Sequence, residues 1–216
     1  MTTRASHAIV IGASMAGLLA ARILSDHFAR VTILERDRFD DSGAYRPGVP
    51  QARHLHVLLI RGEQILQRLF PGFERDMLEV GAVTGRWGLD NGFFTVGGWT
   101  PTFDSGYTSH IISRAALETL VRRRVLAIPH IELRGGVEVE GLTATPDGTA
   151  ITGVRLVPRG QSTEEIVPAD WIVDASGRGS KAPDWLTALG YPVPAETVID
   201  AHCGYATRWY ERPASL

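Results

Sequence analysis

Residues 7–24 constrain the fold of this chain more than any other segment, because an apolar strand pattern breaks at a glycine and passes directly into a helix rich in small residues. Residues 8–11 predict a buried parallel strand, Gly12 permits the tight turn, and Gly17 lets the helix lie close to the sheet. The first turn of a helix carries unpaired N–H groups and the positive end of the helix dipole. The segment therefore predicts a binding site for the pyrophosphate of a dinucleotide.

A second predicted strand, residues 31–34, ends at Glu35, about 20 residues after the glycine turn. An acid at this position accepts hydrogen bonds from ribose hydroxyls and favours a free 2′-hydroxyl over a 2′-phosphate. Ser14 stands where such turns usually have a second glycine; its Cβ narrows the approach to phosphate, but its hydroxyl can donate to a phosphate oxygen. The alternative is an ordinary βαβ turn in which the glycines serve only packing, and Glu35 argues against it.

Composition bounds the class of protein. The chain has 216 residues, 44% of them hydrophobic, which is enough for one large domain or for one domain and part of another. A net charge of −2 gives no reason to expect nucleic acid as a partner, and no stretch is long and apolar enough to cross a bilayer. The apolar run after Arg4 is interrupted by Gly12 and Ser14, unlike a signal peptide. We therefore expect a cytoplasmic protein with no nucleic-acid and no membrane partner.

Cysteine and histidine indicate no metal chemistry. The single cysteine, Cys203, excludes an internal disulfide and a thiolate metal cluster, and is better explained as a buried structural thiol than as a nucleophile. His54 and His56 lie two residues apart with no acid nearby at metal-ligand spacing. No metal site is expected.

A long polar segment, residues 36–53, is punctuated by glycine and proline and predicts a loop of a length that is typically functional. It carries Arg46 and Arg53, followed by His54, into the start of an apolar helix at 56–69, which the next proline and glycine end.

Between residues 81 and 107, aromatic side chains alternate with Gly, Asn and Thr, which predicts short twisted strands. Such a sheet can wall a pocket for a flat organic ligand, or it can pack as a small core. The sequence leaves both alternatives open.

The second half of the chain repeats the strand, turn and helix pattern. Ser113 is a predicted N-cap for a helix that runs to about residue 127. Period-two alternation over 131–167, with two glycine turns, predicts an antiparallel meander of about three strands. Residues 171–180 then predict a buried strand with a second glycine-rich turn, followed by a helix at 183–189.

The order of these parts resembles the FAD-dependent monooxygenases of the para-hydroxybenzoate hydroxylase type, a family related to flavin-dependent reductases, epoxidases and halogenases. Four segments carry the resemblance and together span nearly the whole chain: GASMAG at 12–17 with Glu35, RPGVPQARHLH at 46–56, SRAALETL at 113–120 and VDASGRGS at 173–180.

The resemblance implies an α/β fold of the Rossmann-like FAD-binding βαβ type, with an inserted antiparallel β meander and the beginning of a β-rich substrate domain. It divides the chain into a discontinuous FAD-binding domain, residues 1–85 and 108–190, and a partial substrate-side β domain, residues 86–107 and 191–216.

The resemblance also implies positions that contact the cofactor. It assigns to the FAD pyrophosphate the turn residues Gly12, Ser14, Met15, Ala16 and Gly17. It assigns Glu35 to the adenosine ribose, and it places Arg36 and the backbone of Val137 beside the adenine.

Further positions follow from the other matching segments. Arg114 matches an arginine that meets phosphate or ribose oxygens, the alternative being a solvent-facing helix residue. Asp174 and Gly177 match a turn near the dinucleotide that relatives link to nicotinamide cofactor use, the alternative being a packing turn.

Arg46, Arg53 and His54 are expected towards the flavin ring. We name no catalytic acid or base among them, because in this family the flavin performs the difficult chemistry. The implied reaction is reduction by NADH or NADPH, followed by transfer of one oxygen atom from dioxygen to an aromatic or olefinic small-molecule substrate. The protein places the substrate and excludes water.

The sequence also departs from the family. Relatives carry, beyond position 216 in family order, a Gly-Asp segment leading into a helix that faces the FAD phosphates, whereas none of the 23 glycines here is followed by aspartate. The chain stops soon after residues 204–210, which we expect to be the first long strand of the substrate domain, with an exposed edge near 198–210. We therefore expect an N-terminal half, completed by a missing C-terminal segment or by a second chain.

Three functional hypotheses remain. The first is an FAD-dependent oxidoreductase, an NAD(P)H-using hydroxylase or epoxidase that lacks its C-terminal half here. The second is a noncatalytic Rossmann-like nucleotide-binding remnant or one half of a split flavoprotein. The third is an NAD-dependent dehydrogenase, in which the antiparallel meander and the second turn have no natural place.

Overall fold

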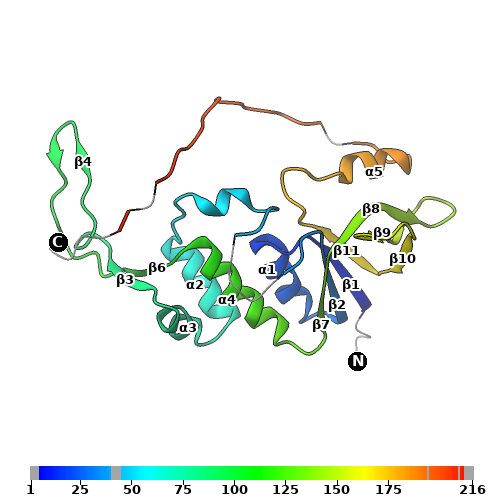
Figure 1. Cartoon of the computed structure of the whole chain (residues 1–216), viewed down its shortest axis with the longest axis horizontal. Helices are drawn as coiled ribbons and strands as arrows, with labels where there is room; N and C mark the ends of the chain where they lie inside the picture. Colours follow the sequence, from blue (N-terminus) through cyan, green and yellow to red (C-terminus); the bar gives the residue numbers. More distant parts are fainter. Residues whose placement is uncertain (1–4, 40–44, 194, 209, 212–216) are drawn as a thin grey trace. The chain divides into compact units, whose positions relative to one another are not determined.

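The computed structural model describes residues 5–39, 45–193, 195–208 and 210–211. Its strands and helices are drawn in Figure 1. The chain forms two compact units, which are described separately below: unit 1 comprises residues 1–49 and 118–195, and unit 2 comprises residues 50–117 and 196–216. The division into an FAD-binding and a substrate-side domain stays a prediction.

Unit 1 is built on a parallel four-stranded sheet in the order β11, β1, β2, β7. Its strands are β11 (Trp171–Asp174), β1 (Ala5–Ile11), β2 (Phe28–Glu35) and β7 (Ile131–Gly135). Helix α1 (Met15–Leu24) connects β1 to β2 and packs against both strands through its buried Leu18 and Ala21. The α/β fold with a Rossmann-like βαβ unit is therefore confirmed.

A second, antiparallel sheet covers the parallel one. It contains β8 (Val137–Ala144), β9 (Ile151–Pro158) and β10 (Glu165–Pro168), in the order β10, β9, β8. The meander was predicted to begin at residue 131, and this boundary is wrong, because β7 pairs in parallel with β2. Gly136, at φ +72°, turns the chain between β7 and β8. Alternation alone does not distinguish an edge strand of one sheet from the first strand of the next.

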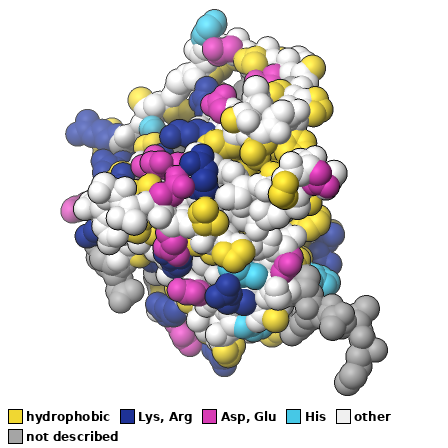
Figure 2. All heavy atoms as spheres, turned by 90° about the vertical axis from the view of Figure 1, so that its right-hand side faces the viewer, with side chains coloured by type: hydrophobic (Ala, Val, Ile, Leu, Met, Phe, Trp, Pro, Cys, Tyr) yellow, Lys and Arg dark blue, Asp and Glu magenta, His cyan; other side chains and the backbone are white. Residues whose placement is uncertain are grey.

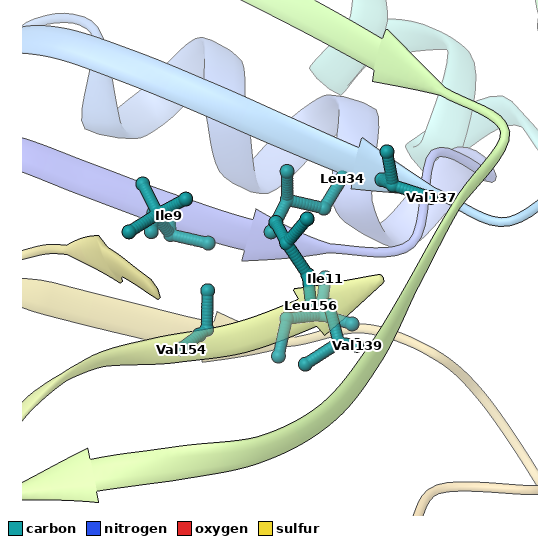
Figure 3. Close-up of a cluster of buried hydrophobic side chains, with 8 residues drawn as sticks. Ile9, Ile11, Leu34, Val137, Val139, Val154 and Leu156 are labelled. Carbon is teal, nitrogen blue, oxygen red and sulfur yellow. The ribbon is translucent and has the colours of Figure 1, made fainter. Parts of the chain in front are cut away.

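The core of unit 1 lies between the two sheets. Figure 3 shows Ile9 and Ile11 of β1 and Leu34 of β2 meeting Val154 and Leu156 of β9. All five side chains are buried, and burying a side chain of this size stabilises a fold by about 1.5 to 3 kcal/mol. Helix α5 (Ala182–Ala188) follows β11, as predicted, and adds the partly buried Trp185 to the same cluster.

His7 of β1 gives unit 1 a dependence on pH. Its Nδ1 lies 2.7 Å from the carbonyl oxygen of Pro168 and its Nε2 lies 2.9 Å from Oγ1 of Thr32. Burial lowers the pKa of His7 below the ordinary 6.5, because the charged imidazolium loses its hydration.

We expect the contribution of His7 to be fully present above about pH 6.5 and to be lost as the pH falls below it, because the unfolded chain then binds a proton that the folded chain does not. Urea unfolding between about pH 5 and pH 8 measures this dependence. The slope should become smaller in His7→Gln, and identical slopes in the two proteins would contradict the prediction.

Unit 2 holds helices α2 (Ile60–Leu69) and α3 (Phe73–Glu79) and two short antiparallel pairs, β3 (Val83–Arg86) with β6 (Thr108–Ile111) and β4 (Phe94–Thr95) with β5 (Gly98–Trp99). A 3-10 turn, Pro50–Arg53, precedes α2. The predicted helix at 56–69 begins four residues later than expected, at Ile60, and α3 was not predicted. The short strands expected at 81–107 are present.

Helix α4 (Arg114–Leu126) begins in unit 2 and continues in unit 1. The hydroxyl oxygen of Ser113 accepts a hydrogen bond from the N–H of Ala116 at 3.2 Å, so the predicted N-cap is confirmed.

The aromatic residues of the β4–β5 hairpin do not form a core. Phe93, Phe94 and Trp99 are 60%, 72% and 71% exposed. Of the two alternatives left by the sequence, packing as a small core is therefore wrong for these three side chains.

The segment after α5 differs from expectation. No strand forms in residues 195–208 and 210–211, so the strand predicted at 204–210, and with it the strand edge near 198–210, is wrong for the described positions. A strand needs a neighbouring strand to pair its backbone N–H and C=O groups, and the described residues supply none here. Cys203, predicted to be buried, is exposed.

The surface carries both signs of charge. On the face drawn in Figure 2, basic and acidic side chains lie close to one another, with hydrophobic side chains between them. Among the described residues, no helix has the length and hydropathy required to cross a membrane.

Candidate nucleotide-binding site

A cavity of about 140 Å³ opens in unit 1 where β1, β2 and β11 reach their carboxyl ends. This is the edge at which parallel α/β sheets bind ligands. The cavity is lined by Ile11, Gly12, Ser14, Leu34, Glu35, Arg36, Arg46, Gly48, Val49, Val137, Glu138, Val139, Ala175, Ser176, Gly179, Lys181 and Trp185.

The two turn glycines are required by close backbone approach. A Cβ at Gly12, which has φ +97°, would lie 2.5 Å from the carbonyl oxygen of Ala175. A Cβ at Gly17 would lie 1.8 Å from the carbonyl oxygen of Gly12. Both glycines therefore hold α1 and the β11 turn against the end of β1, which fixes the position of the N-terminus of α1 beside the cavity.

Glu35 ends β2 with a buried carboxylate at the cavity wall. Its Oε2 accepts a hydrogen bond from the N–H of Ala13 at 2.8 Å, and its Oε1 accepts one from the N–H of Asp37 at 3.0 Å. Nη1 of Arg46 lies 3.4 Å from Oε2. A carboxylate offers about four acceptor positions, so these contacts leave Glu35 able to accept a ribose hydroxyl.

Ser14 occupies the N-cap position of α1 in an extended conformation, but its side chain makes no capping hydrogen bond. Instead, its hydroxyl donates to Oε2 of Glu118 at 3.0 Å. In this structure the hydroxyl is therefore directed towards α4, while the first-turn N–H groups of α1, including those of Met15 and Ala16, keep the orientation that suits an anion.

Arg46 lies in this cavity among acids. Its side chain is 9% exposed and contacts the carboxylates of Glu35, Asp37 and Glu118, whose side chains are 8%, 6% and 7% exposed. Arg53 and His54 belong to unit 2, and the expectation that Arg46 lies with them towards a flavin ring stays a prediction.

The second glycine turn is held by its own side chains. Asp174 accepts hydrogen bonds from the N–H of Ser176, at 2.9 Å, and from the hydroxyl of Ser180. A Cβ at Gly177, which has φ +88°, would meet no atom within 4 Å, so only its backbone conformation requires glycine. Asp174 lines a separate cavity of about 360 Å³ beneath α5 rather than the nucleotide cavity.

The remaining predicted residues lie in unit 2. Arg53 is exposed at the end of the 3-10 turn, and His54 places Nδ1 2.9 Å from Oγ1 of Thr207. Arg114 is the first residue of α4 and is half-buried. Their roles towards a cofactor stay predictions.

Several residues that contact Arg46 or line the cavity were not predicted. Glu118 lies inside the SRAALETL segment and Gly48 inside RPGVPQARHLH, so the matching segments contained them without assigning them a role. Lys181 and Trp185 lie far along the chain and join the cavity only because β11 pairs with β1. No local sequence pattern predicts that Lys181 and Trp185 line the cavity.

Comparison with known proteins finds a similar curated protein and similar solved structures. Protein Rv3254 of Mycobacterium tuberculosis (strain ATCC 25618 / H37Rv) is 38% identical over 222 residues, which cover 97% of this chain and 46% of the relative. The chain thus spans about half the length of this curated relative.

Two solved structures share the fold. The p-nitrophenol 4-monooxygenase PnpA from Pseudomonas putida DLL-E4 matches with a TM-score of 0.59 at 18% identity, over 84% of this chain and 43% of that chain. CmlS, a flavin-dependent halogenase, matches with a TM-score of 0.58 at 24% identity, over 88% of this chain and 32% of that chain. A model of the FAD binding domain family matches residues 5–197, and the chain belongs to this family.

Proposed function

We propose that this chain binds FAD as part of a flavin-dependent monooxygenase that uses NADH or NADPH and acts on an aromatic or olefinic small molecule. The observation that carries the proposal is the buried carboxylate of Glu35, fixed by the N–H groups of Ala13 and Asp37 at the wall of a cavity at the carboxyl end of the sheet. This is the position from which an acid binds the ribose of a dinucleotide.

The residues present fit the adenosine diphosphate part of FAD. The turn from Gly12 to Ser14 and the N-terminus of α1 suit the pyrophosphate, and Glu35 suits the ribose. Arg36 and Val137 line the same cavity and would flank the adenine. Lys181 adds a positive charge at the rim, where its side chain is 59% exposed.

Bound FAD would supply the redox chemistry, accepting a hydride from the nicotinamide and activating dioxygen. The chain's own residues then need only bind and orient the nucleotide and keep water from it. The fold is shared with a p-nitrophenol 4-monooxygenase and with a flavin-dependent halogenase, which supports flavin chemistry on organic substrates but does not choose between the two reactions.

The chain spans 46% of the length of the curated relative Protein Rv3254. We propose that the remaining wall of the flavin and substrate site comes from a further C-terminal segment or from a second chain. A cytoplasmic location, with neither nucleic acid nor membrane as a partner, is part of the same proposal.

Glu35→Ala tests the nucleotide site. We expect it to weaken FAD binding by about 10- to 100-fold, because a charge-assisted hydrogen bond to the ribose contributes about 1.5 to 3 kcal/mol. Titration of FAD fluorescence measures the affinity, and Glu79→Ala serves as the control because its side chain is 68% exposed in α3.

If Glu35→Ala and the wild-type chain bound FAD with equal affinity, the proposed role of Glu35 in binding the ribose would be wrong. A wild-type chain that binds ADP but shows no preference for FAD would favour the noncatalytic nucleotide-binding remnant. A wild-type chain that binds NAD more tightly than FAD would favour the dehydrogenase.

A further inference from the structure

Arg46 makes an unusual number of polar contacts for one side chain. Its Nε and Nη2 both donate to Oε1 of Glu118, at 2.9 and 2.7 Å, and its Nη1 donates to Oδ2 of Asp37 at 3.1 Å. Its Nη1 also lies 3.4 Å from Oε2 of Glu35, and its Nη2 donates to the carbonyl oxygen of Ala13 at 3.3 Å.

We propose that Arg46 is a positioning residue, which partly offsets the charge of three buried carboxylates and thereby holds Glu35 and the phosphate-binding turn in place for the nucleotide. This inference rests on the proposed function and adds to it a residue that acts through its neighbours.

The guanidinium of Arg46 lowers the net negative charge of this cluster. A buried charge is tolerated only when it is paired, and removing one partner leaves the other in an unfavourable environment. Here one guanidinium faces the carboxylates of Glu35, Asp37 and Glu118. Without it, three carboxylates would repel one another and also the diphosphate of an incoming nucleotide.

The contacts also fix the turn geometrically. The backbone of Ala13 is held on both sides, since its N–H donates to Glu35 and its carbonyl oxygen accepts from Arg46. The next residue, Ser14, is held by Glu118, which Arg46 also binds. Displacement of Arg46 would therefore release the turn that precedes α1.

A lysine could not replace this set of contacts. The planar guanidinium directs donors to Glu118 on one side and to Asp37 on the other, and it lies 4.8 Å from the ring centre of Phe39. The guanidinium of Arg122 lies 4.5 Å from the centre of the same ring, so both guanidinium groups pack against Phe39. A lysine ammonium would keep the positive charge of Arg46 but would lose the planar arrangement of N–H donors that contacts Glu118 and Asp37 together.

If Arg46 acts by offsetting negative charge, neutralising one of the carboxylates should partly restore FAD binding to Arg46→Met. In Asp37→Asn one carboxylate is neutralised, while an amide oxygen remains available for the N–H of Gly48, which donates to Oδ2 of Asp37 at 2.9 Å. The double variant Arg46→Met with Asp37→Asn should therefore bind FAD more tightly than Arg46→Met alone. A merely structural role of Arg46 predicts no such recovery.

The experiment compares wild type, Arg46→Met, Arg46→Lys, the double variant and the control Arg75→Met, whose side chain is 78% exposed. FAD affinity is titrated by fluorescence, and amide hydrogen exchange of Ala13, Asp37 and Gly48 is measured without ligand. We expect Arg46→Met to bind FAD about 10- to 100-fold more weakly, Arg46→Lys to lie in between, and the double variant to recover at least about threefold.

In the ligand-free protein, exchange at the three amides should accelerate in Arg46→Met and not in Arg75→Met. Unchanged exchange, unchanged FAD affinity, or a double variant no tighter than Arg46→Met would each overturn the inference. If Arg46→Met does not fold, the same amide hydrogen exchange is measured in Arg46→Lys. Failure of the wild type to bind FAD would instead overturn the proposed function, while the exchange data still show whether Arg46 holds the turn.

Discussion

Replacement of Gly17 by alanine is expected to destabilise unit 1 by at least about 3 kcal/mol or to prevent its folding. The new Cβ would lie 1.8 Å from the carbonyl oxygen of Gly12, which is part of the backbone and cannot move without shifting the turn. Alanine favours a helix over glycine by only about 1 kcal/mol. The steric conflict therefore outweighs the gain in helix propensity.

Gly62→Ala is the matched control for this change. Gly62 also lies in a helix, α2, and a Cβ there would meet only the flexible Cδ1 of Leu58, at 3.4 Å. We expect this variant to be neutral or to gain up to about 1 kcal/mol. Urea unfolding monitored by circular dichroism compares the two, and equal midpoints for Gly17→Ala and wild type would show that the turn is less tightly packed than described.

The second large loss of stability is expected in unit 2, on replacement of Glu63. Glu63 of α2 accepts two hydrogen bonds from His110 of β6: Nδ1 lies 2.7 Å from Oε1, and the backbone N–H donates to Oε2 at 2.9 Å. The side chains are 5% and 3% exposed. Glu63→Ala leaves both donors buried without their acceptor, at about 1 to 3 kcal/mol each, so we expect a loss of about 2 to 6 kcal/mol.

Amide hydrogen exchange of α2 and β6 reports this loss separately from unit 1. Glu79→Ala is the control, because Glu79 is exposed and lies 3.9 Å from its partner Arg75, a distance typical of pairs that contribute at most about 1 kcal/mol. Glu63→Gln should fall between the two, since its amide oxygen replaces only one of the two acceptors. If Glu63→Ala exchanged like Glu79→Ala, the pair would not stabilise unit 2.

The part of the candidate nucleotide cavity formed by β1, the glycine turn and the end of β2 was predictable from sequence, because these elements follow one another closely in the chain. Gly12, Gly17 and Glu35 follow from spacing alone, since a βαβ unit leaves few alternatives for an acid at the end of its second strand. Arg46 was predicted beside a cofactor, but its acidic surroundings were not predicted. The fold places Arg46 with carboxylates from different segments of the chain, which no local pattern indicates.

Features that depend on distant pairing were not predictable. The alternation of β7 is compatible with either sheet, and only its register with β2 places it in the parallel one. Residues 204–208 have the composition of a strand but lack a described neighbour to pair with. Lys181 reaches the cavity through β11, far beyond Glu35 along the chain, and no local signal marks it.

The contact between Gly12 and Ala175 also bears on how cofactor preference can be redesigned. The two turns meet through main-chain atoms, with the space for a Cβ at Gly12 already filled by the carbonyl of Ala175. Engineers can therefore vary the side chains of Ala175 and Ser176, but insertions or deletions in either turn would alter both at once. Libraries intended to change nucleotide selectivity should keep loop length constant and concentrate diversity at Glu35 and Arg36, which line the ligand cavity.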